Sequence, residues 1–342
     1  MNEANGPLRV GVIGVGWHGG THLLNLRANP RAELAAICDV NESLLAERAE
    51  SLGGVRGFVD YGELLACEDV DAVVIALPDP LHRDAAVAAC RAGKHVLLEK
   101  PMALTVEDAE AIAQAAAASP GEFMLNLSNR WMHTFAAGKR RIDSGEMGDV
   151  RYVFARLSNR IDVPTERLTW LSRSHLAHWI GIHRLDIARW WIGRPAVRVR
   201  AVQRGGVLAG RGIDAADFYQ ATIEFDGGAV VCLEGSWILP PTFPALVDSR
   251  FYALCEKGVI EVDRMRSEMA LAGSGGFEMS TPSAGTVLDQ QDGFVYAASR
   301  HFVDCALAGT PPLVSAADGL ALTRICCAIV QSCQADGEVV EL

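Results

Sequence analysis

The fold is decided by the stretch Leu8-Arg9-Val10-Gly11-Val12-Ile13-Gly14-Val15-Gly16-Trp17-His18-Gly19. An apolar run predicts a buried strand, and the glycines that follow are spaced G-x-G-x-x-G before a helical pattern. The first glycine allows a tight turn, the second lets a pyrophosphate approach the backbone, and the third allows close helix packing. The start of the helix then faces the anion. We therefore expect dinucleotide binding by the loop residues Gly14, Gly16, Trp17, His18 and Gly19.

Asp39 ends the second apolar run, twenty residues beyond Gly19. An acid at this spacing accepts hydrogen bonds from the hydroxyls of the adenosine ribose, and its charge opposes a 2′-phosphate. Val40 and Asn41 follow, so the next two positions offer no basic residue to receive that phosphate. The sequence predicts NAD as the cofactor.

Residues 1–125 alternate short apolar runs with helical patterns, which is typical of a doubly wound parallel sheet. Thr105 with Asp108 predicts a capped helix start for 105–118, and another helix is expected over 43–52. The expected strands are 8–13, 33–38, 55–58, 72–77, 95–98 and 122–127. The fold class is therefore α/β with an N-terminal Rossmann domain.

Residues 126–342 have a different pattern, with strands that alternate or run apolar between turn residues. Asp226-Gly227-Gly228 predicts a hairpin turn, and the polar, Gly/Ser-rich stretch 273–293 predicts a surface loop. The expected strands are 150–157, 197–203, 218–225, 229–236 and 249–254, and the expected helices are 133–144, 175–192, 293–308 and 316–335. We expect a second α+β domain with an open, mostly antiparallel sheet.

Composition narrows the function further. The net charge of -11 opposes binding to nucleic acid or an anionic membrane. Nine cysteines without a C-x-x-C spacing predict buried thiols in a reducing compartment. The N-terminus has no signal-peptide pattern, and no apolar run reaches the roughly 20 residues of a membrane span. These features predict a cytoplasmic protein, and an Ala/Arg-rich composition hints at a bacterial one.

Two further strand ends carry polar residues, in Pro78-Asp79-Pro80-Leu81-His82 and Glu99-Lys100-Pro101. Ligands of open α/β sheets bind outside the carboxyl ends of the strands, so both sets are expected at the cofactor crevice. Lys100 can donate to a substrate hydroxyl and stabilise a developing alkoxide, although a surface lysine is the ordinary alternative. Pro101 is a candidate for a cis peptide bond.

A third candidate set lies on the helical stretch that begins near His175. Residues 175, 179, 183 and 186 share one helical stripe, which aligns two imidazoles, an indole and a carboxylate. His183 with Asp186 makes a plausible base and orienting group, and packing at a domain interface is equally compatible with the pattern. A zinc site from His175, His178 and His183 is disfavoured because no cysteine or second acid has a ligand spacing, so no metal is expected.

Taken together, the motifs resemble those of the glucose–fructose oxidoreductase/inositol dehydrogenase (Gfo/Idh/MocA) family over nearly the whole chain. The resemblance rests on Gly14–Gly19 followed by His22, Pro78–His82, Glu99–Pro101, Asn129-Arg130, Gly181–Asp186 and Pro312–Gly319. It implies NAD-dependent oxidation of a secondary alcohol in a sugar or polyol, and a homodimer or homotetramer formed through the exposed sheet face.

The resemblance also implies roles for individual residues. Lys100 is expected beside substrate and nicotinamide, and His183 acts as, or relays to, the general base. The expected neighbours of the nicotinamide half are Pro78, Asp79, His82 and Glu99; the expected substrate contacts are Asn129, Arg130, His175, Trp179 and His183. Trp131, His133 and Trp170 are weaker candidates for the substrate wall.

One position departs from the family pattern. Many members carry Asp four residues before the motif histidine, and here that position is Trp179. His175 could substitute, His183 and Lys100 could act alone, and Trp179 could stack on a sugar ring. Two other functions stay open: the resemblance also includes relatives that are redox-neutral enzymes using tightly bound NAD for transient oxidation, and the Trp179 departure makes a catalytically inactive NAD-binding regulator conceivable.

Overall fold

The computed structural model describes residues 6–168, 172, 174–265, 269–273, 276–280, 284–287 and 290–342. The chain forms two compact units. The first contains Met1–Ser128 and Ala284–Ala321, and the second contains Asn129–Ser283 and Leu322–Leu342. The sequence pattern assigns everything after residue 125 to the second domain, whereas Ala284–Ala321 groups with the first unit.

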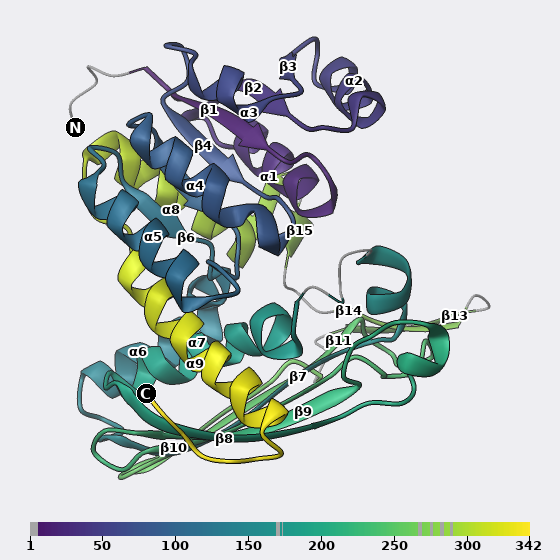
Figure 1. The fold of residues 1–342 in the computed structure, drawn as a ribbon, viewed down its shortest axis with the longest axis vertical. Coiled ribbons are helices and arrows are strands. Elements are labelled where there is room, and N and C mark those ends of the chain that lie inside the picture. Colours follow the sequence, from purple (N-terminus) through teal and green to yellow (C-terminus); the bar gives the residue numbers. More distant parts are fainter. Residues whose placement is uncertain are drawn as a thin grey trace. The chain divides into compact units, whose positions relative to one another are not determined.

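The first unit is built on a six-stranded sheet in the order β3-β2-β1-β4-β5-β6, and all of its strand pairs are parallel (Figure 1). Its strands are β1 Leu8–Ile13, β2 Ala32–Cys38, β3 Arg56–Phe58, β4 Ala72–Ile75, β5 His95–Leu98 and β6 Phe123–Leu125. Their side chains are mostly buried on both faces, as expected for a sheet covered by helices. The order confirms the doubly wound Rossmann arrangement.

Helices connect these strands and cover the sheet. They are α1 Trp17–Ala28, α2 Glu42–Ser51, α3 Tyr61–Leu65, the 3₁₀ turn η1 Asp79–Leu81, α4 His82–Arg91, α5 Val106–Ala118 and, from the second segment, α8 Phe294–Ala308. The predicted cap is present, because Thr105 accepts a hydrogen bond from the Asp108 amide at 3.1 Å. Helices α4 and α5 pack together, as do α1 and α8.

The second unit is built on a seven-stranded sheet in the order β12-β11-β7-β10-β9-β8-β17. Its strands are β7 Val150–Asn159, β8 Ala196–Arg204, β9 Phe218–Phe225, β10 Val230–Ser236, β11 Val247–Cys255, β12 Gly258–Asp263 and β17 Val340–Glu341. Among the pairs of named strands described in this sheet, β10–β7 is parallel and the others are antiparallel. The mostly antiparallel sheet is confirmed, and Asp226-Gly227-Gly228 turns the chain between β9 and β10 with both glycines at positive φ.

The long strands of this sheet carry helical segments on one face (Figure 1). The helical segments of this unit include the 3₁₀ turn η2 Ser128–Trp131, α6 His133–Asp143, the π-helical turns η3 Val163–Arg167 and η5 Ala177–Gly181, α7 Ile182–Ile192 and the 3₁₀ turn η6 Ala209–Arg211. Of these, α7 and η5 pack on β7 and β10, and α6 contacts β12. Side chains alternate between buried and partly exposed along β9 and β10. The sheet therefore packs one face on α7 and η5 and keeps the other open among the residues that the structure describes.

The prediction of a surface loop over 273–293 is wrong for the described residues of this stretch. This stretch contributes to two short hairpins, β13 Met269–Gly273 with β14 Gly276–Ser280 and β15 Ala284–Val287 with β16 Gln290–Gly293. Backbone pairing within each hairpin satisfies the amide groups locally, so strands form in spite of a composition that favours turns.

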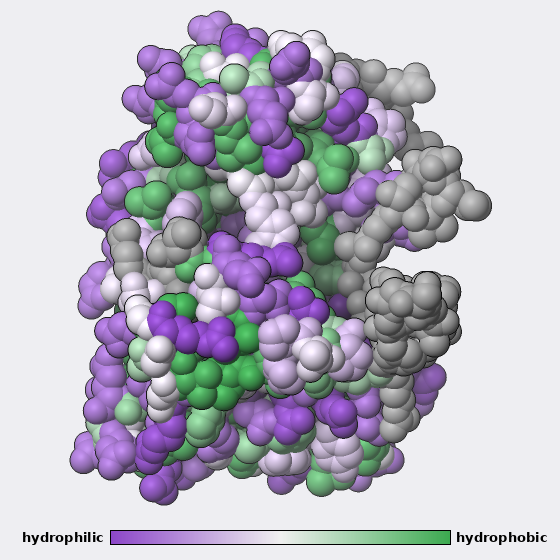
Figure 2. Space-filling model, turned by 90° about the vertical axis from the view of Figure 1, so that its right-hand side faces the viewer, coloured by the Kyte–Doolittle hydropathy of each residue, from purple (hydrophilic) through white to green (hydrophobic). Residues whose placement is uncertain are grey.

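One described helix, α9 Ala316–Gln334, is long and apolar enough by composition to cross a membrane. Three of its exposed positions, Ala317, Arg324 and Gln331, recur every seventh residue, while Leu322 and Cys326 are fully buried. This pattern is that of an amphipathic core helix. On the face drawn in Figure 2, hydrophobic residues form separate patches among hydrophilic ones.

Candidate functional site

The glycine loop connects β1 to α1 and fits a bound pyrophosphate. An added Cβ at Gly14 would lie 2.5 Å from the Ala76 carbonyl, and one at Gly19 would overlap the Gly14 carbonyl, so both glycines are required by packing. A Cβ at Gly16 would meet no atom within 4 Å. The start of α1 has no side-chain cap and no acid in its first turn. The open space at Gly16 and the positive end of the α1 helix dipole therefore suit a bound anion.

Asp39 stands at the end of β2, beside this loop. Its Oδ2 accepts from the Val15 amide at 2.9 Å and its Oδ1 accepts from the Asn41 amide at 2.9 Å. These bonds fix the carboxylate at the edge of the loop while the side chain stays partly exposed. Val40 is 86% exposed and places no positive charge there. The arrangement suits the two ribose hydroxyls of NAD.

Lys100 follows β5 and is buried, with 5% of its surface exposed. Burial lowers the pKa of its amino group, and the neighbouring carboxylates of Asp79 and Glu99 oppose that shift. The Lys100–Pro101 peptide bond is cis, as the sequence suggested. A buried amine beside the carboxyl ends of β4 and β5 can donate to a substrate oxygen at little cost in reorganisation.

The residues from the Pro78–His82 motif divide into two roles. Asp79 is buried and its charge favours the Lys100 ammonium. His82 is fully buried, with Nδ1 2.6 Å from the Pro101 carbonyl oxygen and Nε2 2.9 Å from the Leu77 carbonyl oxygen. Both ring nitrogens of His82 thus contact backbone carbonyl groups, and through Pro101 this histidine holds the segment that carries Lys100.

Glu99 is likewise buried and held by side chains. His22 from α1 and Asn126 from the end of β6 both donate to its Oε1. The sequence analysis identified His22 only as part of a motif and did not identify Asn126. Both residues lie far from Glu99 along the chain, so sequence spacing gives no sign that they contact it. His18, in the first turn of α1, has its pKa lowered to about 4 by burial, against the opposing charge of Glu99.

His183 lies in the first turn of α7, directly after the π-helical turn η5, and its side chain is partly exposed. Such turns inside helices are frequent at functional sites. Trp179, which takes the place of the usual Asp, is on η5 and is 7% exposed. The helix predicted over 175–192 is therefore present from residue 177. Its first turn is π-helical and wider than an α-helical turn, so residues 175 and 179 do not line up with 183 and 186 as a regular α-helix would place them.

Asp186 is fully buried and is bound by an arginine. Arg130 Nη2 donates to its Oδ1 at 2.6 Å, and Arg130 Nε donates to Oδ2 at 3.0 Å. The Arg130 side chain is 3% exposed and also lies 5.4 Å over the ring of Trp190. The structure thus joins two predicted site residues into one buried ion pair that ties α7 to the turn before α6.

His175 has both ring nitrogens in use. Its Nδ1 accepts from the Ala177 amide at 3.0 Å, so Nε2 carries the proton and donates to Gln203 Oε1 at 2.7 Å. His178 is buried, which lowers its pKa to about 3, and its Nε2 lies 3.9 Å from Cys327 Sγ. No group of three or more His, Cys, Asp or Glu side chains gathers as a metal site within the described ranges.

The remaining substrate candidates vary in exposure. Asn129 is 5% exposed, Trp131 is partly exposed and His133 is exposed at the start of α6. Trp170 lies outside the described residues. Exposure does not test whether a residue contacts substrate, so Asn129, Trp131 and His133 stay predictions for the substrate wall.

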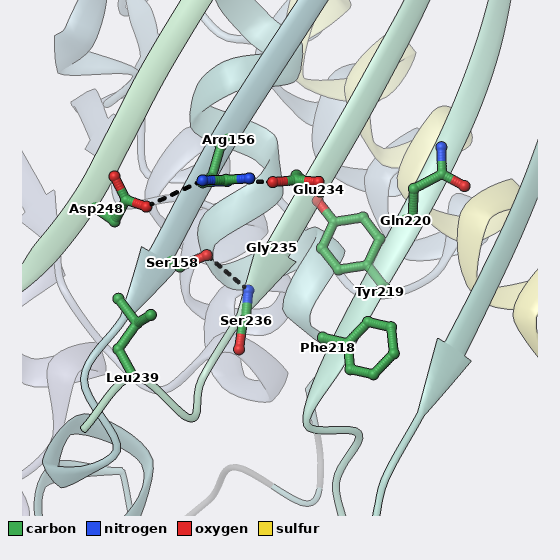
Figure 3. A pocket seen from close by; sticks show the side chains of 10 residues that line it. All are labelled: Arg156, Ser158, Phe218, Tyr219, Gln220, Glu234, Gly235, Ser236, Leu239 and Asp248. Atoms are coloured by element: carbon green, nitrogen blue, oxygen red, sulfur yellow. Dashed lines mark hydrogen bonds and ion pairs between the residues drawn. The ribbon is translucent and has the colours of Figure 1, made fainter. Parts of the chain in front are cut away.

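A separate cavity of about 360 Å³ lies on the sheet of the second unit (Figure 3). Arg156 on β7 points between Glu234 on β10 and Asp248 on β11 and forms ion pairs with both. Phe218 and Leu239 supply its apolar wall. None of the predicted site residues lines this cavity.

Comparisons with known proteins agree with this geometry. The family model described as "Oxidoreductase family, NAD-binding Rossmann fold" matches residues 8–127, and the GFO/IDH/MocA C-terminal domain matches residues 135–261. The chain is 26% identical to myo-inositol 2-dehydrogenase of Thermotoga maritima, over 91% of this chain and 92% of that protein. It is 29% identical to levoglucosan dehydrogenase of Pseudarthrobacter phenanthrenivorans, over 67% of each chain.

Solved structures show the same fold. The scyllo-inositol dehydrogenase of Lactobacillus casei, with bound NAD(H) and scyllo-inositol, superposes with a TM-score of 0.84 at 21% identity, over 98% of this chain and 99% of that one. The fold and the glycine loop define an NAD-binding oxidoreductase. The chain belongs to the GFO/IDH/MocA family.

Proposed function

We propose that the protein is an NAD-dependent dehydrogenase that oxidises a secondary alcohol of a polyol, sugar or sugar derivative. The observation that carries the proposal is the buried Lys100, which follows β5 at the same sheet edge as a glycine loop with space for a pyrophosphate. Relatives that match over most of their length are named inositol dehydrogenases. The substrate class is taken from these relatives and from the chemistry of the lysine.

The protein side of the reaction uses two residues. Lys100 donates a hydrogen bond to the reacting oxygen and stabilises its negative charge, which a buried amine does more effectively than an exposed one. His183 accepts the hydroxyl proton as general base. NAD, when bound, supplies the carbon that accepts the hydride. Gly14–Gly19 and Asp39 hold the cofactor.

The proposal changes the role of two predicted site residues. Asp186 anchors α7 through Arg130, because a fully buried carboxylate with both oxygens bound to a guanidinium is a poor proton acceptor. Trp179 supplies an apolar surface for the ring face of a substrate in place of the usual carboxylate.

The test is absorbance at 340 nm after NAD is added with a panel of inositols, sugars and anhydrosugars. NADH should accumulate with at least one member, and Lys100→Met should reduce kcat by roughly 100-fold or more. Lys257→Met is the matched control because this exposed lysine contacts only the Gly145 carbonyl among the contacts described. Retained cofactor with product but no NADH would replace the proposal with redox-neutral chemistry.

We further propose a homodimer or homotetramer in a bacterial cytoplasm, formed through the open face of the second sheet. This face carries partly exposed Tyr152, Phe154 and Cys232 on neighbouring strands. Light scattering of the eluting protein gives its mass directly, and a monomer at micromolar concentration would contradict this assembly.

A further inference from the structure

Three buried side chains meet at the end of β5. His22 Nε2 lies 2.8 Å from Glu99 Oε1, and Asn126 Nδ2 donates to the same oxygen at 2.7 Å. The other oxygen, Oε2, accepts from the Lys100 amide at 3.2 Å. His22 is 1% exposed, Asn126 4% and Glu99 8%. The carboxylate next to Lys100 in sequence is thus bound by α1 on one side and by the end of β6 on the other.

His22 has a single polar contact in this arrangement. A carboxylate oxygen only accepts, so Nε2 of His22 carries the ring proton and donates it to Glu99. Nδ1 of His22 is buried and meets no hydrogen-bonding partner in the described part of the chain. Leaving a buried acceptor unpaired costs about 1–3 kcal/mol. A histidine here is therefore disfavoured for packing alone, and the bond to Glu99 is the contribution that offsets the cost.

The state of Glu99 depends on these donors. Burial raises the pKa of this carboxyl, but the hydrogen bond from His22 and the interactions with His22, His18 and Lys100 outweigh burial and hold the pKa well below its usual range. Removing the His22 donor leaves burial opposed by Asn126, by the Lys100 amide and by the interactions with His18 and Lys100. The pKa of the carboxyl would then rise, and the carboxylate would be held less firmly beside Lys100.

We propose that His22 is a positioning residue for Lys100, acting through Glu99. His22 holds the carboxylate in place, and Glu99 then fixes both the backbone amide and the electrostatic surroundings of the lysine. The inference rests on the proposed function only for the catalytic role of Lys100. It links the helix that follows the cofactor loop to the lysine that faces the substrate.

The groups around Lys100 set the expected direction of the effect. Asp79 from η1 and Glu99 favour its ammonium form, burial disfavours it, and His18 from α1 lies near enough to interact with both. Loosening the Glu99 carboxylate weakens one of these two favourable influences on the ammonium form of Lys100. Lys100 should then lose its proton at lower pH.

The sequence allows this to be measured without substrate, because it contains four lysines: Lys94, Lys100, Lys139 and Lys257. Protein labelled with ¹³C at lysine Cε gives one resonance for each, assigned by Lys→Arg replacement, and the shift of each follows protonation of its amine. The full-length protein without added NAD is titrated as wild type, His22→Leu, His22→Gln and Glu99→Gln.

We expect His22→Leu to move the Lys100 midpoint to lower pH by about one unit. Glu99→Gln should move it at least as far. His22→Gln should restore it, because the glutamine amide reaches the position of the imidazole Nε2. His22→Asn, whose amide is too short, serves as a second loss variant if His22→Leu does not fold.

The matched control is His95→Gln, since His95 lies at the other end of β5 and accepts a hydrogen bond from the Glu122 amide. It should leave the Lys100 midpoint unchanged. A Lys100 midpoint that moves in Glu99→Gln but not in His22→Leu or His22→Asn would overturn the inference.

Kinetics separate this inference from the proposed function. With an active substrate, His22→Leu should lower kcat at least tenfold while KM for NAD changes less than twofold, and His22→Gln should recover most of kcat. If no substrate is ever found but the Lys100 midpoint responds as expected, the proposed function fails and the positioning role stands.

Discussion

Replacing Gly181 by alanine tests how the turn before His183 is held. Gly181 ends η5, and the hydroxyl of Tyr219 on β9 lies against its Cα, so an added Cβ would overlap that oxygen. The ring carbon Cζ of Tyr219 would be 3.1 Å from the same Cβ, which is only slightly too close. The tyrosine hydroxyl is thus the atom that requires glycine at position 181.

The magnitude follows from this geometry. Overpacking a buried site costs about 1–3 kcal/mol, and the overlap at Gly181 is severe, so Gly181→Ala should lose about 3 kcal/mol of the free energy of unfolding. Tyr219→Phe alone should be neutral or slightly stabilising, because the buried hydroxyl has no partner among the described residues. The double variant should recover about 2 kcal/mol, because only the Cζ contact remains.

The assay is urea denaturation of all four proteins, with NADH formation measured in parallel. A coupling of about 2 kcal/mol between the two changes supports the direct contact, since distant sites add independently. Activity should fall in Gly181→Ala and return in the double variant, because the same turn places His183. A double variant as unstable as Gly181→Ala alone would refute this reasoning.

Three further predictions address the cofactor site and the buried ion pair. Gly16→Ala should leave the free energy of unfolding within about 0.5 kcal/mol of wild type but weaken NADH binding at least tenfold in fluorescence titration, whereas Gly19→Ala should destabilise the fold because its Cβ overlaps a backbone carbonyl; wild-type affinity in Gly16→Ala would contradict the pyrophosphate fit. Asp39→Asn should raise the ratio of kcat/KM for NADP to that for NAD about tenfold, because it removes the charge that opposes a 2′-phosphate; an unchanged ratio would exclude Asp39 from the ribose site. Arg130→Met should cost about 3–5 kcal/mol in urea denaturation because it removes the guanidinium that binds the buried Asp186 carboxylate, and Asp186→Leu added to it should recover most of that loss; equal stability of the single variant and wild type would show that the pair is not essential.

The fold could be predicted from sequence because its strongest signals are local. The strand predicted over 8–13 is confirmed as Leu8–Ile13, and those over 95–98 and 218–225 also match their observed bounds. Apolar strands flanked by glycine turns need little tertiary information. The hairpins within 269–293 could not be predicted, because polar and glycine-rich residues have a low intrinsic preference for strands. They form strands here through backbone pairing with the adjacent strand of each hairpin.

Site residues were harder to place because a motif gives residue type and not side-chain direction. His82 follows β4 as a crevice residue should, yet both of its ring nitrogens face backbone carbonyls inside the first unit. Arg130 belongs to a recognised motif, but its guanidinium is directed at Asp186, which is 56 residues away in sequence. Such partners are brought together only by tertiary packing.

The tryptophan at position 179 is where sequence and structure together narrow the chemistry. The sequence left open whether His175 replaces the missing carboxylate, and the structure uses both nitrogens of His175 to bind Ala177 and Gln203. Asp186 has both oxygens bound to Arg130. Neither can take up a proton without breaking buried hydrogen bonds, at about 1–3 kcal/mol for each group left unpaired. These contacts support the proposal that His183, and not His175 or Asp186, takes the proton, and that Trp179 offers the substrate an apolar surface where relatives offer a carboxylate.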